Sequence, residues 1–265
     1  TSSEDKTPNE INDAAIDQRV EQILSKLTLE DKCGEMTQLN LDMVCVGEPY
    51  NLEKPNRLDS AKLRKVLVDL KVGSILNQGG QAYSREKWFE LINEIQRVAT
   101  QEKKSKIPVL YGIDAIHGNA LVSGTTVYPS PITLASTWSD SFLYDVGKQS
   151  AKEMRATGSH WAFTPNIDVL RDPRWGRVGE TFGEDPFMVG NLGASMINGF
   201  QLNDFTGTNK VIACAKHMIA GSEPINGLNA APMDISLRTL KEVYLPPYKK
   251  AIDAGVYSIM AAHNE

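Results

Sequence analysis

The segment Pro108-Val-Leu-Tyr-Gly-Ile-Asp114 places an almost wholly apolar run directly before an aspartate. Such a run, in which polar residues do not alternate, is typical of a strand that is covered on both faces, as in parallel sheets. Runs of the same kind occur at Leu39–Val46, Val72–Leu76, His160–Thr164, Val211–Ala215 and Tyr257–Ala262. The sequence therefore predicts about six buried strands.

Helical patterns separate these runs. Apolar residues recur at helical spacing from about Ala14 and again over Leu58–Leu70, Ser84–Lys104, Asp140–Thr157, Pro186–Leu202 and Ser236–Ala254. Thr28, Asp59 and Asp185 stand where helix caps are expected, and the adjacent prolines at 246 and 247 should interrupt the last helix. Because parallel strands need long crossover connections, strands that alternate with helices indicate an α/β fold with parallel pairing.

Polar residues follow three of the predicted strands. Asp114 follows the strand that ends at Ile113. Lys216 and His217 follow the strand that ends at Ala215, and His263 follows the strand that ends at Ala262. The carboxyl ends of the strands meet at one mouth in a barrel, or line a crevice in an open doubly wound sheet. A lysine directly after a buried strand needs a charge partner or must lose its proton. Together these residues predict a site for a polar, hydroxyl-rich ligand.

Each of these residues also has a structural explanation. Asp114 alone is equally suited to capping the turn that follows it, and His217 alone is more often a satisfied core histidine. His117 and His160 are expected to be structural. The functional interpretation therefore depends on the three strand ends taken together, and not on any single residue.

A second group of charged residues lies between Asp168 and Asp185, interleaved with Trp175 and several glycines. Arg171 and Asp172 are expected to brace this loop. The planar guanidinium groups here present fixed forks of donors that suit sugar hydroxyls, and the ring of Trp175 can pack on the apolar face of a pyranose. The loop over residues 219–234 has little periodicity, and long ordered loops are often functional.

Composition narrows the class of protein. The chain has 265 residues, a net charge of -5, 41% hydrophobic and 23% charged residues, which is an ordinary globular balance and argues against a nucleic-acid partner. Three cysteines indicate no disulfide framework, and we expect them to be small buried residues. The sequence contains no phosphate loop, no GxSxG elbow, no HExxH pair and no apolar run that could span a bilayer. No cofactor and no metal are implied.

Several motifs resemble glycoside hydrolase family 3, in the branch of β-glucosidases and glucan exohydrolases. They occur in the order that is typical of the family and cover nearly the whole chain: Leu27-Thr-Leu-Glu-Asp-Lys32, Tyr111-Gly-Ile-Asp-Ala-Ile-His-Gly118, Asp172-Pro-Arg-Trp-Gly-Arg177, Gly179-Glu-Thr-Phe-Gly-Glu-Asp185, Lys216-His217 and Tyr244-Leu-Pro-Pro-Tyr248. The resemblance implies a TIM-type (β/α)8 barrel, here incomplete with about six β/α units, as one domain over residues 1–265. The α/β sandwich domain that follows in the family is expected to be absent.

The resemblance also implies an activity and a set of site residues. It implies that the parent enzyme removes terminal non-reducing β-D-glucosyl units by a retaining mechanism, with two carboxyl groups about 5–5.5 Å apart. Asp114, Arg177, Lys216 and His217 are expected to bind hydroxyls of the terminal glucose, and His263 stands at the same mouth. The nucleophile and the acid/base are expected beyond Glu265, so the isolated chain should be inactive.

The sequence departs from the family pattern at two places. Leu228 and Asn229 stand where many β-glucosidases carry Arg-Asp, and His263 stands where a tyrosine or phenylalanine is common. These departures leave the preference for linkage and aglycone open.

Other functions and a location can also be weighed. The same chemistry on β-xylosides is a close alternative, and a non-catalytic sugar-binding fragment is another. A lyase or aldolase that uses Lys216 as a Schiff base is a third.

The expected partners are a β-glucoside or β-glucan oligosaccharide and the remainder of the parent chain, which should complete the barrel. The polar residues 1–12 are compatible with a signal peptide that has been removed, so a periplasmic or secreted location is expected.

Overall fold

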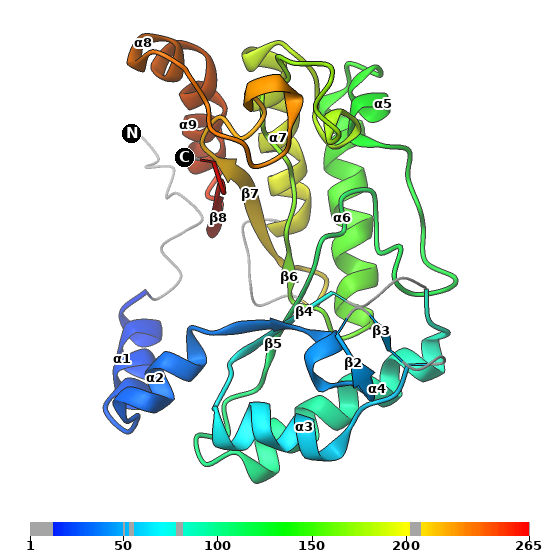
Figure 1. The fold of residues 1–265 in the computed structure, drawn as a ribbon, viewed down its shortest axis with the longest axis vertical. Helices are drawn as coiled ribbons and strands as arrows, with labels where there is room; N and C mark the ends of the chain where they lie inside the picture. The colour runs from blue at the N-terminus through cyan, green and yellow to red at the C-terminus, as the bar shows by residue number, and fades with distance from the viewer. Residues whose placement is uncertain (1–12, 50, 53–55, 78–81, 202–207, 265) are drawn as a thin grey trace, which may run out of the picture. The chain divides into compact units, whose positions relative to one another are not determined.

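The computed structural model describes residues 13–49, 51–52, 56–77, 82–201 and 208–264. The chain forms two compact units that meet in the sequence between residues 112 and 113, and each is described by itself. Along the described chain the sheet strands follow one another in the order β1, β4, β5, β6, β7 and β8 (Figure 1). The expectation of about six strands alternating with helices is therefore confirmed.

The first unit contains three parallel strands. These are β1 (Gln38–Asn40), β4 (Ser74–Leu76) and β5 (Leu110–Ile113), and the last residue of β5 begins the second unit. In the register of this sheet, Leu39 lies beside Ile75, and Ile75 lies beside Tyr111. A separate antiparallel pair is formed by β2 (Gly47–Glu48) and β3 (Asn51–Leu52).

The prediction of a strand over Leu39–Val46 is wrong beyond Asn40. The strand ends at Asn40, whose side chain accepts a hydrogen bond from the backbone N–H of Asp42. This local bond starts the 3-10 turn η1 (Leu41–Val44), in which Leu41 and Val44 are still buried. The apolar run thus marks burial correctly, while a side-chain hydrogen bond changes the backbone conformation.

Helices of the first unit begin at the caps expected from the sequence. α1 (Asp13–Leu24) is followed by α2 (Leu29–Glu35), which Thr28 and Asp31 open with a capping box. Asp59 caps α3 (Ser60–Arg64) by accepting hydrogen bonds from the backbone N–H groups of Ala61 and Lys62. The predicted helices 58–70 and 84–104 both end in π-helical turns, since η2 (Lys65–Asp69) extends α3 and η3 (Val98–Glu102) extends α4 (Arg85–Arg97).

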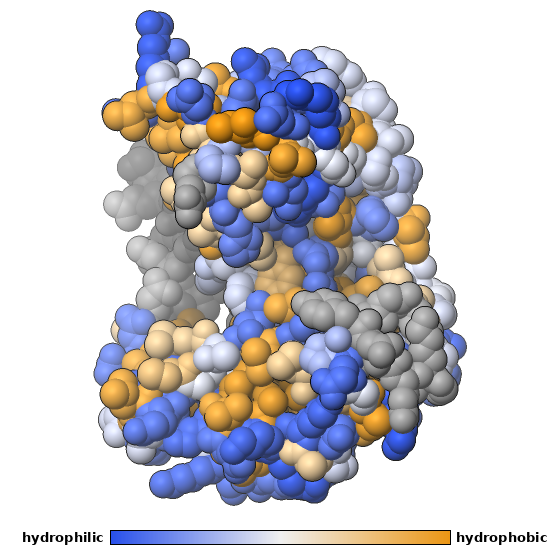
Figure 2. Space-filling view, viewed as in Figure 1, coloured by the Kyte–Doolittle hydropathy of each residue, from blue (hydrophilic) through white to orange (hydrophobic). Residues whose placement is uncertain are grey.

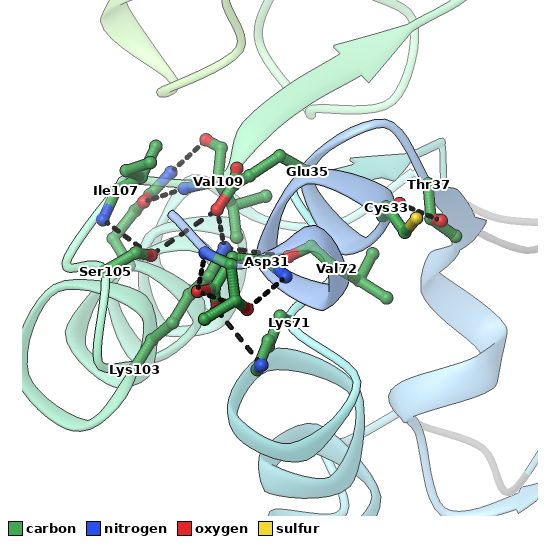
Figure 3. Close-up of polar contacts among 12 residues, drawn as sticks. Asp31, Cys33, Glu35, Thr37, Lys71, Val72, Lys103, Ser105, Ile107 and Val109 are labelled. Atoms are coloured by element: carbon green, nitrogen blue, oxygen red, sulfur yellow. Dashed lines mark hydrogen bonds and ion pairs between the residues drawn. The ribbon is translucent and has the colours of Figure 1, made fainter. Parts of the chain in front are cut away.

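A buried ion pair ties together parts of the first unit that are distant in sequence. Lys103 is almost completely buried, and its ammonium group binds the carboxylate of Glu35 in α2 and the carbonyl oxygen of Val72, 3.4 Å away (Figure 3). Asp31 pairs with Lys71 nearby, at 3.2 Å. These contacts give the buried lysine the charge partner that burial requires.

The second unit contains the other three parallel strands and the longest helices. β6 (Trp161–Ala162), β7 (Ile212–Met218) and β8 (Ser258–Ala261) pair in that order. The helices are α5 (Pro131–Ala135), α6 (Asp140–Ala156), α7 (Pro186–Gln201), α8 (Leu237–Thr239) and α9 (Leu245–Asp253). Asp185 caps α7 as expected, because its Oδ1 accepts from the N–H of Met188 at 2.9 Å. The predicted end of this helix, Leu202, lies outside the described residues.

Two other expectations for the second unit need correction. Lys216 and His217 do not follow β7 but belong to it, because β7 keeps its pairing with β8 as far as Met218. The predicted helix over residues 236–254 changes its helical register in the π-helical segment η6 (Leu240–Tyr244). Pro246 and Pro247 then occupy the first turn of α9, where a backbone N–H is not needed.

Two of the three cysteines are buried. Cys45 and Cys214 are buried as expected, but Cys33 is exposed, so that expectation is wrong for Cys33. In the described ranges, none of the helices has the length and apolar character that crossing a membrane would require. Figure 2 shows apolar patches among the polar side chains on the visible face.

Candidate functional site

All five residues expected at the site lie in the second unit. Asp114 comes directly after β5, Lys216 and His217 are in β7, and His263 follows β8. Arg177 lies in the loop between β6 and α7, immediately before the 3-10 turn η4 (Val178–Glu180). The ends of parallel strands therefore supply four of the residues, and an intervening loop supplies the fifth.

Lys216 and Asp114 form an ion pair. The Nζ atom of Lys216 lies 2.7 Å from Oδ1 of Asp114, although the two residues are 102 positions apart in sequence. The lysine side chain is only 2% exposed, whereas the aspartate side chain is 42% exposed. The expectation that a lysine in this position requires a charge partner is confirmed, and the carboxylate of that partner remains accessible from outside.

His217 is held by a buried carboxylate. Its Nδ1 atom lies 2.8 Å from Oδ2 of Asp168, and its backbone N–H donates to Oδ1 of the same residue at 3.2 Å. The side chain of Asp168 is 0% exposed. Asp168 begins the charged loop that is evident in the sequence, but only its hydrogen bonds connect it with the histidine.

Arg177 is oriented by Glu180. Its Nε and Nη2 atoms donate to the two carboxylate oxygens of Glu180 at 3.0 and 2.7 Å, in a bidentate pair. Burial alone would raise the pKa of Glu180, but the hydrogen bonds and charge of Arg177 outweigh burial and lower the pKa below its usual value. For Arg177, burial opposes the positive charge, while Glu180, Asp168 and Asp114 raise its pKa. These carboxylates therefore lie close enough to act on the guanidinium.

A small polar pocket brings three of the expected residues together. Arg177, His217 and His263 all line it. The other lining residues are Trp175, Gly221, Asn229, Ala230, Ala262 and Asn264. Lys216 directly precedes His217 in β7 and pairs with Asp114 at 2.7 Å, so the Lys216–Asp114 pair lies beside a residue that lines this pocket. The structure therefore brings all five expected residues to one region of the second unit.

One expected feature of the pocket is wrong. Trp175 is 2% exposed, and its indole N–H donates to Oδ1 of Asn229 at 3.0 Å. Its ring is thus part of the pocket wall and does not present an open face for a sugar. The guanidinium of Arg177 lies 5.8 Å from the centre of this ring, which holds the pair together as a cation–π contact.

Sequence reasoning missed several residues of this region. Asp168 acts through His217, 49 positions away, and nothing in its local sequence identifies this partner. Glu180 acts through Arg177, which precedes it by three residues. Asn229 and Asn264 line the pocket, and Nδ2 of Asn264 donates to the carbonyl of Ala231 at 2.8 Å. The long loop over residues 219–234 was the available signal for Asn229.

The arrangement suits a neutral polyol. The accessible carboxylate of Asp114 accepts hydrogen bonds, while Lys216 and Arg177 donate them, and the opposite charges lie in pairs. A ligand with many hydroxyl groups can be both donor and acceptor, so it leaves few of these buried groups without a partner. Among the described residues, no group of three or more His, Cys, Asp or Glu side chains is arranged to hold a metal ion.

Comparison with known families identifies the chain. The model of the glycosyl hydrolase family 3 N-terminal domain matches residues 28–265. The chain belongs to glycosyl hydrolase family 3. The motifs that suggested this family in the sequence therefore identified it correctly.

Family 3 relatives match along most of the chain. A lysosomal β-glucosidase of Dictyostelium discoideum is 31% identical over 95% of this chain, and a β-xylosidase of Formosa agariphila is 37% identical over 75%. A periplasmic β-glucosidase of Salmonella typhimurium is 31% identical over 94%. The matched parts are 32%, 28% and 29% of these proteins, so this chain spans about a third of the length of its curated family 3 relatives.

A solved family 3 structure has the same fold. The exo-1,3/1,4-β-glucanase of a Pseudoalteromonas species is 29% identical, with a TM-score of 0.81 over 95% of this chain and 31% of that chain. The prediction of an α/β fold with six strands of an incomplete TIM-type barrel is confirmed by this likeness and by the parallel pairs within each unit.

Proposed function

We propose that the protein containing this chain hydrolyses terminal non-reducing β-D-glucosyl residues of oligosaccharides or glucosides, and that this chain supplies the subsite for the terminal glucose. The observation that carries the proposal is the convergence of the Lys216–Asp114 pair, Arg177, His217 and His263 in one region of the second unit. The β-glucosidase and glucanase names of the family 3 relatives support this substrate class.

In the proposed mechanism, this chain binds and orients the sugar. Asp114 accepts hydrogen bonds from sugar hydroxyls, while Lys216, Arg177, His217 and His263 contact hydroxyls around the same ring. The family mechanism needs a carboxylate nucleophile and a carboxylic acid about 5–5.5 Å apart, on the same sugar. We assign both carboxyl groups to parts of the longer protein beyond Glu265, so that this chain forms a single N-terminal barrel domain that is inactive alone.

Assays of the complete protein test this proposal. Equal concentrations of an aryl β-D-glucoside and an aryl β-D-xyloside are supplied separately, and kcat/KM is measured for each. A higher kcat/KM for the glucoside supports the proposal. The absence of hydrolysis of either substrate by the complete protein would reject it, and the non-catalytic sugar-binding function would then be preferred.

A β-xylosidase is the second candidate, because a relative of that name is 37% identical over 75% of the chain. Xylose differs from glucose by lacking the hydroxymethyl group at carbon 5. A higher kcat/KM for the xyloside in the same assay would favour this candidate. The sugar-binding role of Asp114 and Lys216 would stand in either case.

We also propose that the protein is exported to the periplasm or secreted. A periplasmic relative and substrates of the glucan class support this location. Cell fractionation with an antibody against the protein tests it, and recovery from the cytoplasmic fraction alone would reject it.

A further inference from the structure

Asp168 is the most completely enclosed charged group in the described site. Its side chain has no exposed surface, and its backbone N–H donates to Oδ1 of Asn166 at 2.9 Å. The neighbouring Ile167 N–H donates to the carbonyl of Lys216 at 2.8 Å, which ties this segment to β7. The segment that carries Asp168 is therefore fixed against β7, the strand that carries His217.

The two carboxylate oxygens of Asp168 make different hydrogen bonds to His217. Oδ1 accepts from the backbone N–H of His217, a group that is always a donor. Oδ2 lies 2.8 Å from Nδ1 of the same histidine. Because an ionised carboxylate only accepts hydrogen bonds, this contact places a proton on Nδ1. Nε2 is then the ring nitrogen that remains for a ligand in the pocket that His217 lines.

We propose that Asp168 is a positioning residue, which fixes the tautomer and the ring orientation of His217 so that Nε2 meets one hydroxyl of the bound sugar. This inference rests on the proposed function, because it assigns a partner to the Nε2 atom in the glucose subsite. Asp168 itself is enclosed and does not touch the sugar. Its effect on turnover passes entirely through the imidazole.

The substitution Asp168→Asn tests this role because the side chain keeps its shape. The backbone N–H of His217 still needs an acceptor, so it retains the amide oxygen, and the amide NH2 then faces Nδ1. Nδ1 must become the acceptor, and the proton moves to Nε2. We expect kcat/KM of the complete protein for an aryl β-glucoside to fall about 10- to 100-fold, the usual effect of losing a charge-assisted hydrogen bond.

A panel of monodeoxy aryl glucosides separates positioning from general damage. The complete protein should lose kcat/KM when the hydroxyl that meets Nε2 is absent, and Asp168→Asn should show no further loss for that one analogue. If Asp168→Asn lowers kcat/KM by the same factor for every analogue, the role of Asp168 is purely structural and the inference is overturned. Glu153→Gln, a carboxylate-to-amide change that lies on α6, should leave all values unchanged.

A readout without activity distinguishes a failure of this inference from a failure of the proposed function. ¹⁵N NMR of protein labelled at histidine distinguishes a protonated Nδ1 from an unprotonated one, and a His217→Gln variant assigns the signal. We expect a protonated Nδ1 in the parent protein and an unprotonated one in Asp168→Asn. An unprotonated Nδ1 in the parent protein would overturn the inference even if glucosides are hydrolysed. A correct tautomer without any hydrolysis would instead reject the proposed function alone.

Discussion

At the scale of single residues, the site consists of pairs in which one partner is enclosed and the other is more open. Lys216 is buried while its partner Asp114 is accessible, and His217 lines the pocket while its partner Asp168 is enclosed. A buried charge is stable only with a hydrogen-bonded counter-charge. The Lys216–Asp114 ion pair and the His217–Asp168 hydrogen bond therefore hold the ligand-binding side chains in place before a ligand arrives.

Replacement of Asp114 should separate binding from folding. In the complete protein, Asp114→Ala removes the accessible carboxylate and leaves the ammonium of Lys216 without this partner. We expect kcat/KM for an aryl β-glucoside to fall by at least about 100-fold, because at least two charge-assisted hydrogen bonds are lost. The far-ultraviolet circular dichroism spectrum should stay the same. Asp145→Ala, on the exposed side of α6, is the matched control. Unchanged turnover in Asp114→Ala would reject the assignment of Asp114 to the site.

At the scale of elements, the close approach of the two longest helices depends on glycine. α6 and α7 lie side by side in the second unit (Figure 1), and a Cβ atom on Gly147 of α6 would lie 2.5 Å from the carbonyl oxygen of Met196 in α7. A Cβ atom on Gly199 of α7 would meet the carbonyl oxygen of Tyr144 and lie 2.9 Å from the N–H of Lys148. Backbone atoms cannot move aside as a flexible side chain can.

Gly199→Ala should therefore destabilise the second unit. We expect the free energy of unfolding to fall by about 1–3 kcal/mol, which is typical of overpacking at a tight contact. Gly179→Ala is the control, since a Cβ atom there would meet only the Cβ of Ser130, at 4.0 Å. Urea unfolding followed by circular dichroism measures both variants. Equal midpoints for the two variants would show that the α6–α7 contact is looser than described.

At the scale of the whole molecule, carboxylates with lowered pKa values are spread over both units. Backbone and side-chain hydrogen bonds from Thr28 lower the pKa of Asp31 from 3.8 to about 2. The pKa values of several other carboxyl groups are also lowered, by hydrogen bonds or nearby arginines: Asp59, Glu94, Glu102, Asp172 and Glu180. The folded state therefore binds protons less readily than the unfolded chain in acid.

This difference predicts the direction of acid sensitivity. A carboxyl group whose pKa is lowered by folding stabilises the folded state above its unfolded pKa, and this stabilisation is lost as the pH falls towards the folded pKa. We expect Tm to decrease between about pH 5 and pH 2. The decrease should be smaller for Asp31→Asn, which cannot ionise at this cap. Thermal melts at a series of pH values measure both, and parallel curves would contradict the assignment.

The sheet has an open edge at β8. This strand pairs with β7, and among the described strands none pairs with its other edge. Ile259 in β8 and Tyr257 just before it are exposed. Exposed strand edges with apolar side chains favour pairing with another chain. The remainder of the longer protein is the partner that we expect to cover this edge.

The isolated chain of residues 1–265 should consequently self-associate. We expect sedimentation velocity to show oligomers whose proportion grows with concentration. Ile259→Lys places a charge at the edge and should shift the distribution towards monomer. Glu242→Lys, on the exposed surface of η6, adds positive charge elsewhere and should not. A monodisperse monomer with a sharp melting transition would contradict this prediction.

Local sequence patterns were sufficient for most of the strands, the helices and their caps. Apolar runs and capping residues act over a few neighbouring positions, so Asp59 and Asp185 could be assigned from the sequence alone. Side-chain chemistry at the strand ends, together with the family motifs, also identified the candidate site residues. Their roles in sugar binding stay predictions until the assays above are made.

Only the tertiary structure decided which groups meet. Asp168 and His217 are 49 positions apart, and Lys216 and Asp114 are 102 apart, so no local pattern could pair them. Burial of Trp175 and the extension of β7 through His217 likewise depend on neighbours that other segments bring. Local patterns record which residues favour a strand, a helix or a cap, whereas the partner of a charge depends on how distant segments pack around it.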